Sequence, residues 1–309
     1  MHLGIIDCGT NTFNFIVVEP TESGFKTIYN NKIAVKLGQG GIHKGFIEKT
    51  AFERGLNALK EFSKESKKFN LTTIKAFATA AIRDASNGID FCAEATKIEN
   101  IQIEIIDGER EAELIYKGNR MAVGLSDQNS LIFDIGGGSN EYIIGNKNGI
   151  LWKKSFRLGV ARLLEEFNPS DPIKDEERYQ MIQYLNNELI ELQNAIDKYK
   201  PVELIGSSGA FDSVIEILYA KNNDDDFVKD RTCFQLEVND YRQISKEIMM
   251  SNITERMQIK GLVEMRVDMI VVSCILIDQI LNLSKVLSIR VSSYSLKEGV
   301  VFEYLNRLK

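Results

Sequence analysis

Histidine, cysteine and proline are scarce in this chain of 309 residues. The two histidines, His2 and His43, nearly exclude a Ser-His-Asp or Cys-His mechanism. The four cysteines are scattered without a Cys-x-x-Cys pair, so neither a disulfide framework nor a zinc site is predicted. No Pro/Ser/Gly-rich stretch indicates a flexible linker. The two domains that this chain length predicts should therefore meet across a packed hinge.

An excess of positive charge is also absent. The net charge of −6 at pH 7 gives no overall basic field that would attract nucleic acid or an anionic membrane. A polyanionic ligand would therefore need a local site made of backbone amides, a metal ion and a few cations. Seven residues are candidates either for such cations or for ordinary solvated surface charge: Lys32, Lys36, Lys44, Lys153, Lys154, Arg157 and Arg162.

Long hydrophobic runs are missing as well. The N-terminal residues MHLGIIDCG contain neither the basic segment nor the cleavable apolar segment of a signal peptide. The longest apolar stretch, residues 267–283, is interrupted by Asp268, Asp278 and Gln279 and is shorter than the roughly 20 residues that a membrane span needs. We expect a buried helix at this stretch and a cytoplasmic protein.

What the sequence does contain is an internal repeat. Residues 5–17 read IIDCGTNTFNFIV and residues 132–144 read IFDIGGGSNEYII, so Asp7 aligns with Asp134. Each copy has the pattern of an apolar strand ending in Asp, a small polar turn, a second strand and, after another turn, a third strand. The repeat predicts two α/β halves, each opening in an antiparallel meander.

The remaining segments alternate between helical and strand patterns. Thr50 and Glu53 predict a capping box at the start of the first long helix. We expect one domain at residues 1–122 and a second at residues 123–309, with the final helix, 296–309, packing back on the first domain. The other expected elements are strands at 73–79, 101–106, 203–206 and 286–292, and helices at 109–123, from Asp171-Pro172 through 196, and at 264–283.

The repeated turns have the composition of a phosphate site. Glycine allows the backbone to approach a ligand closely, and the N–H groups of such a turn can point at phosphate oxygens. Asp7 and Asp134, at the strand ends, can hold Mg²⁺ or another divalent cation directly or through water. The simpler interpretation of the glycine run alone is a tight turn. The expected phosphate ligands in the two turns are Gly9, Thr10, Asn11, Thr12, Gly136, Gly137, Gly138 and Ser139.

These two motifs resemble the first and second phosphate motifs of the actin–hexokinase–chaperone ATPase superfamily. Within it, the chain is similar nearly end to end to exopolyphosphatases and guanosine pentaphosphate phosphohydrolases. The resemblance implies two actin-like (ribonuclease H-like) α/β domains, each with a mixed sheet, that face an interdomain cleft. Other segments that carry the resemblance are FATAAIRDASN (77–87), IEIIDGEREAELIYKG (103–118), FRLGVARLLEEF (156–167), LIGSSGA (204–210), MRVD (265–268) and YSLKEGVVFEYL (294–305).

The resemblance also implies a catalytic base. On spacing alone, Glu109, Glu111 and Glu113 are equivalent carboxylates at a helix start, where the helix dipole favours Glu in any case. The family motif selects Glu111 as the base that takes a proton from the attacking water. Arg110 replaces the first of the family's paired acids, so that carboxylate cannot be essential in this chain.

Further roles come from the same resemblance. Glu141 matches the acid that closes the second loop and would orient a metal-bound water, the alternative being a solvated turn residue. Arg83 would neutralise a bound phosphate, or would instead form an ion pair with Asp84 or a neighbouring carboxylate. The segment Gly206, Ser207, Ser208 and Gly209 matches a loop that would line the cleft beside the phosphates.

Three residues depart from the family pattern. Asn14 and Asn140 retain hydrogen-bonding capacity, whereas Ala210 lacks a hydroxyl near the position where relatives hold a nucleoside. The predicted function is an Mg²⁺-dependent exopolyphosphatase that releases terminal orthophosphate from inorganic polyphosphate. The alternatives are a guanosine pentaphosphate phosphohydrolase, an ATP-dependent kinase of the superfamily and a non-catalytic polyphosphate or nucleotide sensor. A homodimer is compatible with the sequence, although no exposed apolar stripe demands one.

Overall fold

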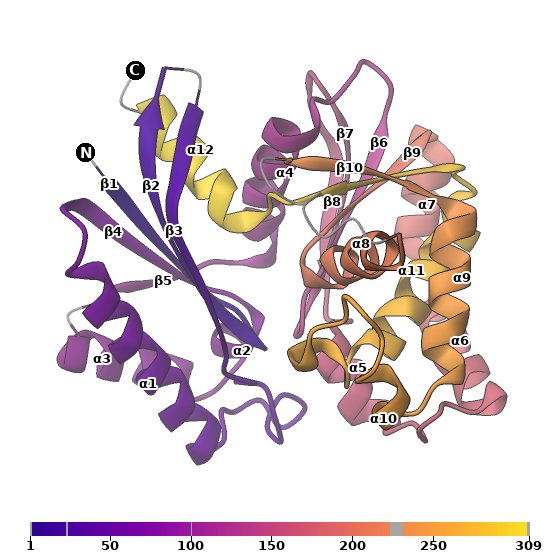
Figure 1. Ribbon diagram of the computed structural model, residues 1–309, viewed down its shortest axis with the longest axis horizontal. Helices are drawn as coiled ribbons and strands as arrows, with labels where there is room; N and C mark the ends of the chain where they lie inside the picture. The colour runs from indigo at the N-terminus through magenta and orange to yellow at the C-terminus, as the bar shows by residue number, and fades with distance from the viewer. Residues whose placement is uncertain (1, 23, 100, 223–230, 308–309) are drawn as a thin grey trace.

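The computed structural model describes residues 2–22, 24–99, 101–222 and 231–307. Figure 1 shows two lobes side by side, each built on one mixed β-sheet with helices packed against it. The prediction of two α/β halves with mixed sheets is confirmed.

The first sheet has the strand order β3-β2-β1-β4-β5. The first three strands form the predicted meander, because β1 pairs antiparallel with β2 and β2 with β3, while β4 lies parallel to β1 and β5 parallel to β4. The bounds are β1 (His2–Cys8), β2 (Thr12–Thr21), β3 (Gly24–Ala34), β4 (Leu71–Ala78) and β5 (Ile103–Ile105), with helices α1 (Lys49–Ser66), α2 (Ala80–Arg83) and α3 (Gly88–Glu99).

The second sheet repeats this order with one added edge strand. Its order is β10-β11-β9-β6-β7-β8, in which β6, β7 and β8 form the meander and β9 and β11 follow in parallel. The strands are β6 (Ser130–Ile135), β7 (Asn140–Asn146), β8 (Gly149–Phe156), β9 (Glu203–Ser207), β10 (Cys233–Glu237) and β11 (Ser288–Ser292). The helices are α5 (Val160–Phe167), α6 (Asp175–Glu188), α7 (Ile190–Tyr199), α8 (Gly209–Lys221), α9 (Val238–Met250), α10 (Ile253–Arg256), η1 (Glu264–Arg266) and α11 (Ile270–Ser284).

The strand register preserves the repeat residue by residue. Asp7 on β1 faces Asn14 on β2, and Asp134 on β6 faces Glu141 on β7. At the position opposite the aspartate, the first half has a neutral amide and the second a carboxylate. Like charges directly opposite each other on a sheet repel, so the second pair is the strained one.

Two helices connect the lobes. Helix α4 (Gly108–Val123) ends at a left-handed Gly124, and α12 (Leu296–Arg307) returns along it to the first lobe (Figure 1). The crossing is tight: a Cβ added at Gly118 would lie 2.1 Å from the carbonyl oxygen of Ser295, and one at Gly299 would lie 1.9 Å from that of Leu114. We propose the domain boundary at residues 122 and 123, where α4 ends.

We propose that α12, the last helix, packs back on the first domain. Leu296 and Val300 of α12 share a buried cluster with Leu3 and Ile5 of β1. Apolar side chains from the two ends of the sequence thus bury one another, which stabilises the lobe contact by the hydrophobic effect. Residues 308 and 309 of the expected helix lie outside the described residues.

Three expected helix starts were wrong. Helix α1 begins at Lys49, so Thr50 lies inside its first turn and forms no capping box. The helix expected from Asp171-Pro172 begins at Asp175, where the Glu177 carboxylate accepts the Lys174 N–H, and it is interrupted at Leu189. The helix expected from residue 264 is a short 3₁₀ turn followed by α11 from Ile270. In the described part of the chain, no helix is both long and apolar enough to cross a membrane.

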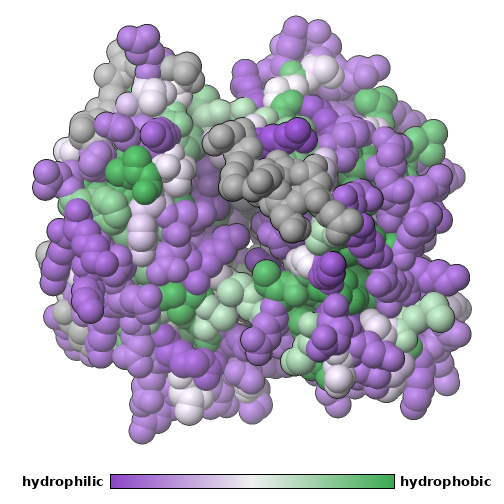
Figure 2. All heavy atoms as spheres, in the orientation of Figure 1, coloured by the Kyte–Doolittle hydropathy of each residue, from purple (hydrophilic) through white to green (hydrophobic). Residues whose placement is uncertain are grey.

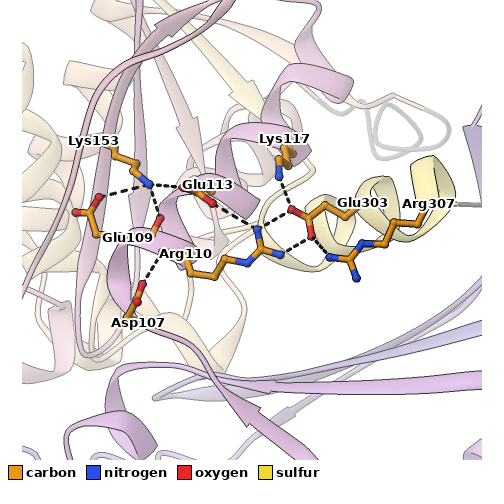
Figure 3. A network of polar contacts seen from close by, with 8 residues as sticks. All are labelled: Asp107, Glu109, Arg110, Glu113, Lys117, Lys153, Glu303 and Arg307. Carbon is orange, nitrogen blue, oxygen red and sulfur yellow. Dashed lines mark hydrogen bonds and ion pairs between the residues drawn. The ribbon is translucent and has the colours of Figure 1, made fainter.

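A network of charges holds the first turns of α4 against α12 and β8 (Figure 3). Arg110 of α4 donates to both carboxylate oxygens of Glu303 on α12, with 2.6 Å from Nη1 to Oε1, and Lys117 donates to the same carboxylate. On the other side, Lys153 of β8 donates to Glu113 at 2.6 Å. The hydrogen bond from Arg110 is the first cause that lowers the pKa of Glu303 to about 2.

Replacing Glu303 with glutamine should therefore destabilise the fold in a pH-dependent way. A carboxylate whose pKa is depressed on folding contributes stability above its unfolded pKa, and this contribution is lost as the pH falls toward the folded value. At pH 7, the free energy of unfolding of wild type should be roughly 1–3 kcal/mol higher than that of Glu303→Gln. This difference should shrink as the pH falls from about 4.5 to 2. Urea unfolding at pH 7 and pH 3 measures this difference.

Glu94→Gln serves as the control, because the Glu94–Lys97 pair on α3 is exposed and should change stability by less than about 0.5 kcal/mol. An equal effect of Glu303→Gln at both pH values would show that the ion network does not contribute through charge.

Candidate active site

A cavity of about 620 Å³ lies between the lobes, and both repeated turns line it. Figure 2 shows the surface hollowed along the line between the two lobes. Asp7 and Asp134 both face this cavity, together with the turns that follow them. The two halves of the repeat thus share one crevice.

The two turns are in direct contact. A Cβ added at Gly137 would lie 2.4 Å from Nδ2 of Asn11, and one at Gly138 would lie 2.7 Å from Oγ1 of Thr10 and 2.7 Å from Cβ of Ala80. No side chain can be accommodated at either glycine without moving the opposite turn. Glycine is therefore required here by close approach of the two lobes.

Each turn has its carbonyl oxygens bound by the segment that follows its meander. In the first half, the N–H of Val35 donates to the Asn11 carbonyl at 2.9 Å, and the N–H of Leu37 donates to that of Thr10 at 2.7 Å. In the second half, the N–H of Ala161 at the start of α5 donates to the Gly137 carbonyl at 2.9 Å. With these carbonyls engaged, the turns offer N–H groups and hydroxyls to an anion.

Asp134 is held by three serine hydroxyls. Ser207 donates to its Oδ2 at 2.6 Å, Ser208 donates to its Oδ1 at 2.7 Å, and Ser295 also donates to Oδ2. Ser208 has a φ of +75°, a left-handed conformation that is unusual outside glycine and that places its hydroxyl on the carboxylate. These three donors fix the orientation of the carboxylate, so Asp134 is a pre-oriented ligand.

Asp7 has fewer partners. Its Oδ2 accepts one hydrogen bond, from Nδ2 of Asn14 at 3.1 Å. Burial raises its pKa to about 6, and the positive charge of Lys297 is the largest influence that opposes this rise. The effect of burial on Asp7 thus outweighs the positive charge of Lys297, and a bound cation would offset it further.

Glu141 lies beneath the second turn, 1% exposed, and does not line the cavity. Its Oε1 accepts hydrogen bonds from Ser139 at 2.8 Å and from Ser155 at 2.7 Å. Burial, followed by repulsion from Asp134 opposite it on the sheet, raises its pKa to about 7. The alternative of a solvated turn residue is wrong, because this side chain is buried.

Glu111 is presented by the first turn of α4, where the Asp107 side chain accepts the N–H of Arg110 at 2.7 Å and caps the helix. The Glu111 side chain lines the cavity, and its Oε2 accepts from Nη1 of Arg83 at 2.9 Å. Burial and then the charge of Glu141 raise the pKa of Glu111 well above its usual value, while Arg83 lowers it. A raised pKa makes this carboxylate a stronger base.

The carboxylate oxygens that line the cavity are suitable ligands for a divalent metal ion. Among the described residues, more carboxylates than cations line the cavity, so a terminal phosphate would meet an excess of negative charge from these side chains without added cations. In the described part of the chain, no three His, Cys, Asp or Glu side chains form a ready-made metal site. Asp7, Asp134 and Glu141 are therefore not assembled as one set. Mg²⁺ is typically bound by one or two carboxylates, with water and phosphate oxygens as its other ligands, and Asp7 and Asp134 could supply the carboxylates. The lining charges are Asp7, Glu111, Asp134, Asp212, Glu216 and Glu298 against Lys32, Arg231, Arg266 and Lys297.

Comparison with known proteins agrees with this geometry. A family model described as the Ppx/GppA phosphatase family matches residues 16–308. The chain belongs to the Ppx/GppA phosphatase family. The predictions of the family and of a hydrolase acting on phosphoric anhydride bonds are confirmed.

Relatives of this Ppx/GppA phosphatase include Exopolyphosphatase 1 of Mycobacterium tuberculosis, which is 26% identical over 308 residues, 99% of this chain and 89% of the relative. The crystal structure of an exopolyphosphatase from Cytophaga hutchinsonii superimposes with a TM-score of 0.97 at 40% identity, covering 100% of this chain and 99% of the other. The Aquifex aeolicus family member has a TM-score of 0.81 at 22% identity over 100% of this chain and 99% of the other, a likeness of fold.

The structure places most predicted site residues of this Ppx/GppA phosphatase on the cavity. Arg83 points to Glu111 and to the Ile106 carbonyl, so the ion-pair alternative describes it. Gly206 packs against Phe211, and Ser207 binds Asp134. The residues that line the cavity are Asp7, Gly9, Thr10, Asn11, Thr12, Glu111, Asp134, Gly136, Gly137, Gly138, Ser139, Ser208 and Gly209, whereas Arg83, Glu141, Gly206 and Ser207 do not.

The sequence offered seven candidate cations for a polyanionic ligand, and the structure describes all seven. Among them, only Lys32 lines the cavity of this phosphatase, where it is 3.8 Å from Asp212. The others form ion pairs: Lys36 with Asp268, Lys44 with Glu48, Lys153 with Glu113, Lys154 with Glu191, and Arg157 and Arg162 with Asp84. Sequence reasoning missed Ser295, Lys297 and Arg266. The segments YSLKEG and MRVD contain them, but nothing in either segment assigns a role.

Proposed function

We propose that this protein is an exopolyphosphatase that releases terminal orthophosphate from inorganic polyphosphate by in-line attack of water. The observation that carries the proposal is one cavity on which two phosphate-type turns, two aspartates and Glu111 converge, with Arg83 bound to Glu111 behind it. The relatives from M. tuberculosis and C. hutchinsonii are both named exopolyphosphatases, and polyphosphate is the substrate class of that name.

In the proposed mechanism, the N–H groups of the two turns and the hydroxyl of Thr10 bind the terminal phosphate, while the Ser139 hydroxyl stays on Glu141. Glu111 accepts a proton from the attacking water, and its buried position strengthens it as a base. Arg83 orients the Glu111 carboxylate through the 2.9 Å hydrogen bond and limits the rise of its pKa. Asp7 and Asp134 would hold Mg²⁺ or another divalent cation, which when bound would offset phosphate charge.

Phosphate release from polyphosphate, guanosine pentaphosphate and ATP, each with and without Mg²⁺, tests this function. Polyphosphate should give the highest kcat/KM, because Ala210 lines the cavity and offers no hydroxyl to a nucleoside. A higher kcat/KM for guanosine pentaphosphate would assign the chain to that activity. ATP consumption that requires an added acceptor would indicate a kinase, and binding without phosphate release would indicate a sensor.

A cytoplasmic location and a homodimer stay predictions. Cell fractionation tests the first, and light scattering of the purified chain tests the second.

A further inference from the structure

The proposed site lacks the cation that was assigned to it from the sequence. Arg83 does not line the cavity, since its guanidinium is engaged by Glu111 and by the Ile106 carbonyl. The turns contribute N–H groups and hydroxyls, which are neutral donors. Hydrogen bonds from a charged donor to phosphate are roughly twice as strong as those from neutral donors, so the identity of the cavity's cations decides how a phosphate is stabilised.

Among the described residues, four cations line the cavity, and three of them are not placed at the two aspartate turns. Lys32 pairs with Asp212 at 3.8 Å. Arg266 lies flat against Gly209, where a Cβ would be 1.6 Å from its Nη2, and Asp212 is the first carboxylate to offset its burial. Arg231 is exposed on the segment before β10.

Lys297 differs from these three in its neighbours. Its side chain is 14% exposed and lines the cavity with Asp7 and Asp134. The positive charge of Lys297 lowers the pKa of Asp7. Ser295, two residues earlier, donates a hydrogen bond to Asp134. This short segment before and within α12 thus contacts one aspartate turn and faces the other.

The orientation of Lys297 is controlled by Glu298. One oxygen of Glu298 is 2.9 Å from Nζ of Lys297, and the other accepts the N–H of Ser295 at 2.9 Å. Glu298 is itself buried at 6% exposure. An ammonium with three donors keeps further donors available when one is directed to Glu298, and the cavity is the open side.

The position of this segment relative to Glu111 is also restrained. Helix α12 cannot approach or leave α4 freely, because the backbones touch at Gly118 and Gly299. About one turn beyond Gly299, Arg110 and Lys117 bind Glu303 of α12. Since α4 also presents Glu111, the same contacts set the distance between Lys297 and the base.

We propose that Lys297 is a catalytic residue: its ammonium group binds a non-bridging oxygen of the terminal phosphate beside the Asp7 turn and stabilises the charge of the transferring group. This assignment rests on the proposed function. It makes α12 a contributor to the site, in addition to the two repeated turns and to α4, which presents Glu111. The interaction strengthens as negative charge shifts onto the phosphate oxygens, so it acts mainly on kcat.

The test compares Lys297→Met, Lys297→Arg and wild type in phosphate release from polyphosphate. Lys297→Met should lower kcat/KM by about 10²–10³-fold, the range for removing one donor to a developing oxyanion. Lys297→Arg keeps the charge and should stay within about tenfold of wild type. Lys147→Met is the matched control, because Lys147 pairs with Asp127 on an exposed hairpin away from the cavity, and it should leave the rate unchanged.

A binding measurement separates contact with the substrate from a structural role. In the Glu111→Gln background, calorimetry with tripolyphosphate should show affinity at least about tenfold weaker when Lys297→Met is added. The double variant Lys297→Met/Glu298→Gln, which removes both buried charges together, should fold like wild type and remain as slow as the single variant.

Two outcomes would overturn the assignment: a Lys297→Met rate within about threefold of wild type, or a slow variant that binds tripolyphosphate normally and recovers its rate when Glu298→Gln restores stability. Failure of the proposed function looks different, because wild type itself would then release no phosphate from polyphosphate.

Discussion

Replacing Glu111 with glutamine is expected to lower kcat for polyphosphate by about 10²–10⁴-fold, the usual contribution of a general base. Glutamine keeps the size of the side chain and can still accept a hydrogen bond from Arg83, so the local structure should persist. It cannot take a proton from water. The KM should therefore change little, while the rate falls.

The pH dependence gives a second test of Glu111. Burial and the nearby Glu141 raise the pKa of Glu111, so a growing fraction is ionised as the pH rises, and kcat/KM of wild type should increase with pH on its acidic side. The glutamine variant should lack the part of this increase that Glu111 causes. Steady-state phosphate release between pH 5 and 9 measures both effects.

Glu109→Gln is the matched control for this prediction. Glu109 belongs to the same helical turn, but its carboxylate is half-exposed and pairs with Lys153 at 3.4 Å outside the cavity. Its rate should stay within about twofold of wild type. If Glu109→Gln were slow and Glu111→Gln were near normal, the base would have to be reassigned.

Replacing Asp134 with asparagine is expected to lower kcat/KM at fixed Mg²⁺ on the order of 10²–10³-fold, since a metal-assisted phosphoryl transfer depends on several kcal/mol of charge stabilisation. The amide has the shape of the carboxylate, and the hydroxyls of Ser207, Ser208 and Ser295 can rotate to meet it. The negative charge is lost. The Mg²⁺ concentration for half-maximal rate should rise accordingly.

A titration of the rate with Mg²⁺ separates these effects. Asp127→Asn, at an exposed residue of the loop between α4 and β6 that pairs with Lys147, should reproduce the wild-type titration curve. If Asp134→Asn has an unchanged Mg²⁺ requirement, Asp134 does not hold the metal. Full activity of this variant would also remove the second turn from the proposed mechanism.

Much of this architecture was predictable because it rests on local patterns. The repeat of Asp7 and Asp134 predicted two meanders, and β1–β3 and β6–β8 confirm them. Alternating strand and helix patterns predicted the parallel strands that follow. Helix starts were less predictable, because Thr50 and Pro172 are favourable near a helix start without determining the residue at which hydrogen bonding begins.

The direction of individual side chains was not predictable. Arg83 carries the same charge whether it faces a phosphate or Glu111. Only the tertiary structure, which brings α2 within hydrogen-bonding distance of Glu111 on α4, decides between them. Glu141 follows the second turn closely, yet the alternation of β7 directs it away from the cavity toward Ser139 and Ser155.

The sequence by itself determined the duplicated strand–turn–strand units, their glycines and their aspartates, because these depend on residue type and short spacing. Tertiary structure decided which groups meet across the cavity. Ser295 lies 161 positions from Asp134 and still donates to it, because the glycine crossing of α4 and α12 returns the C-terminal helix to the site. Contacts between such distant segments depend on how the lobes pack, which no local pattern encodes.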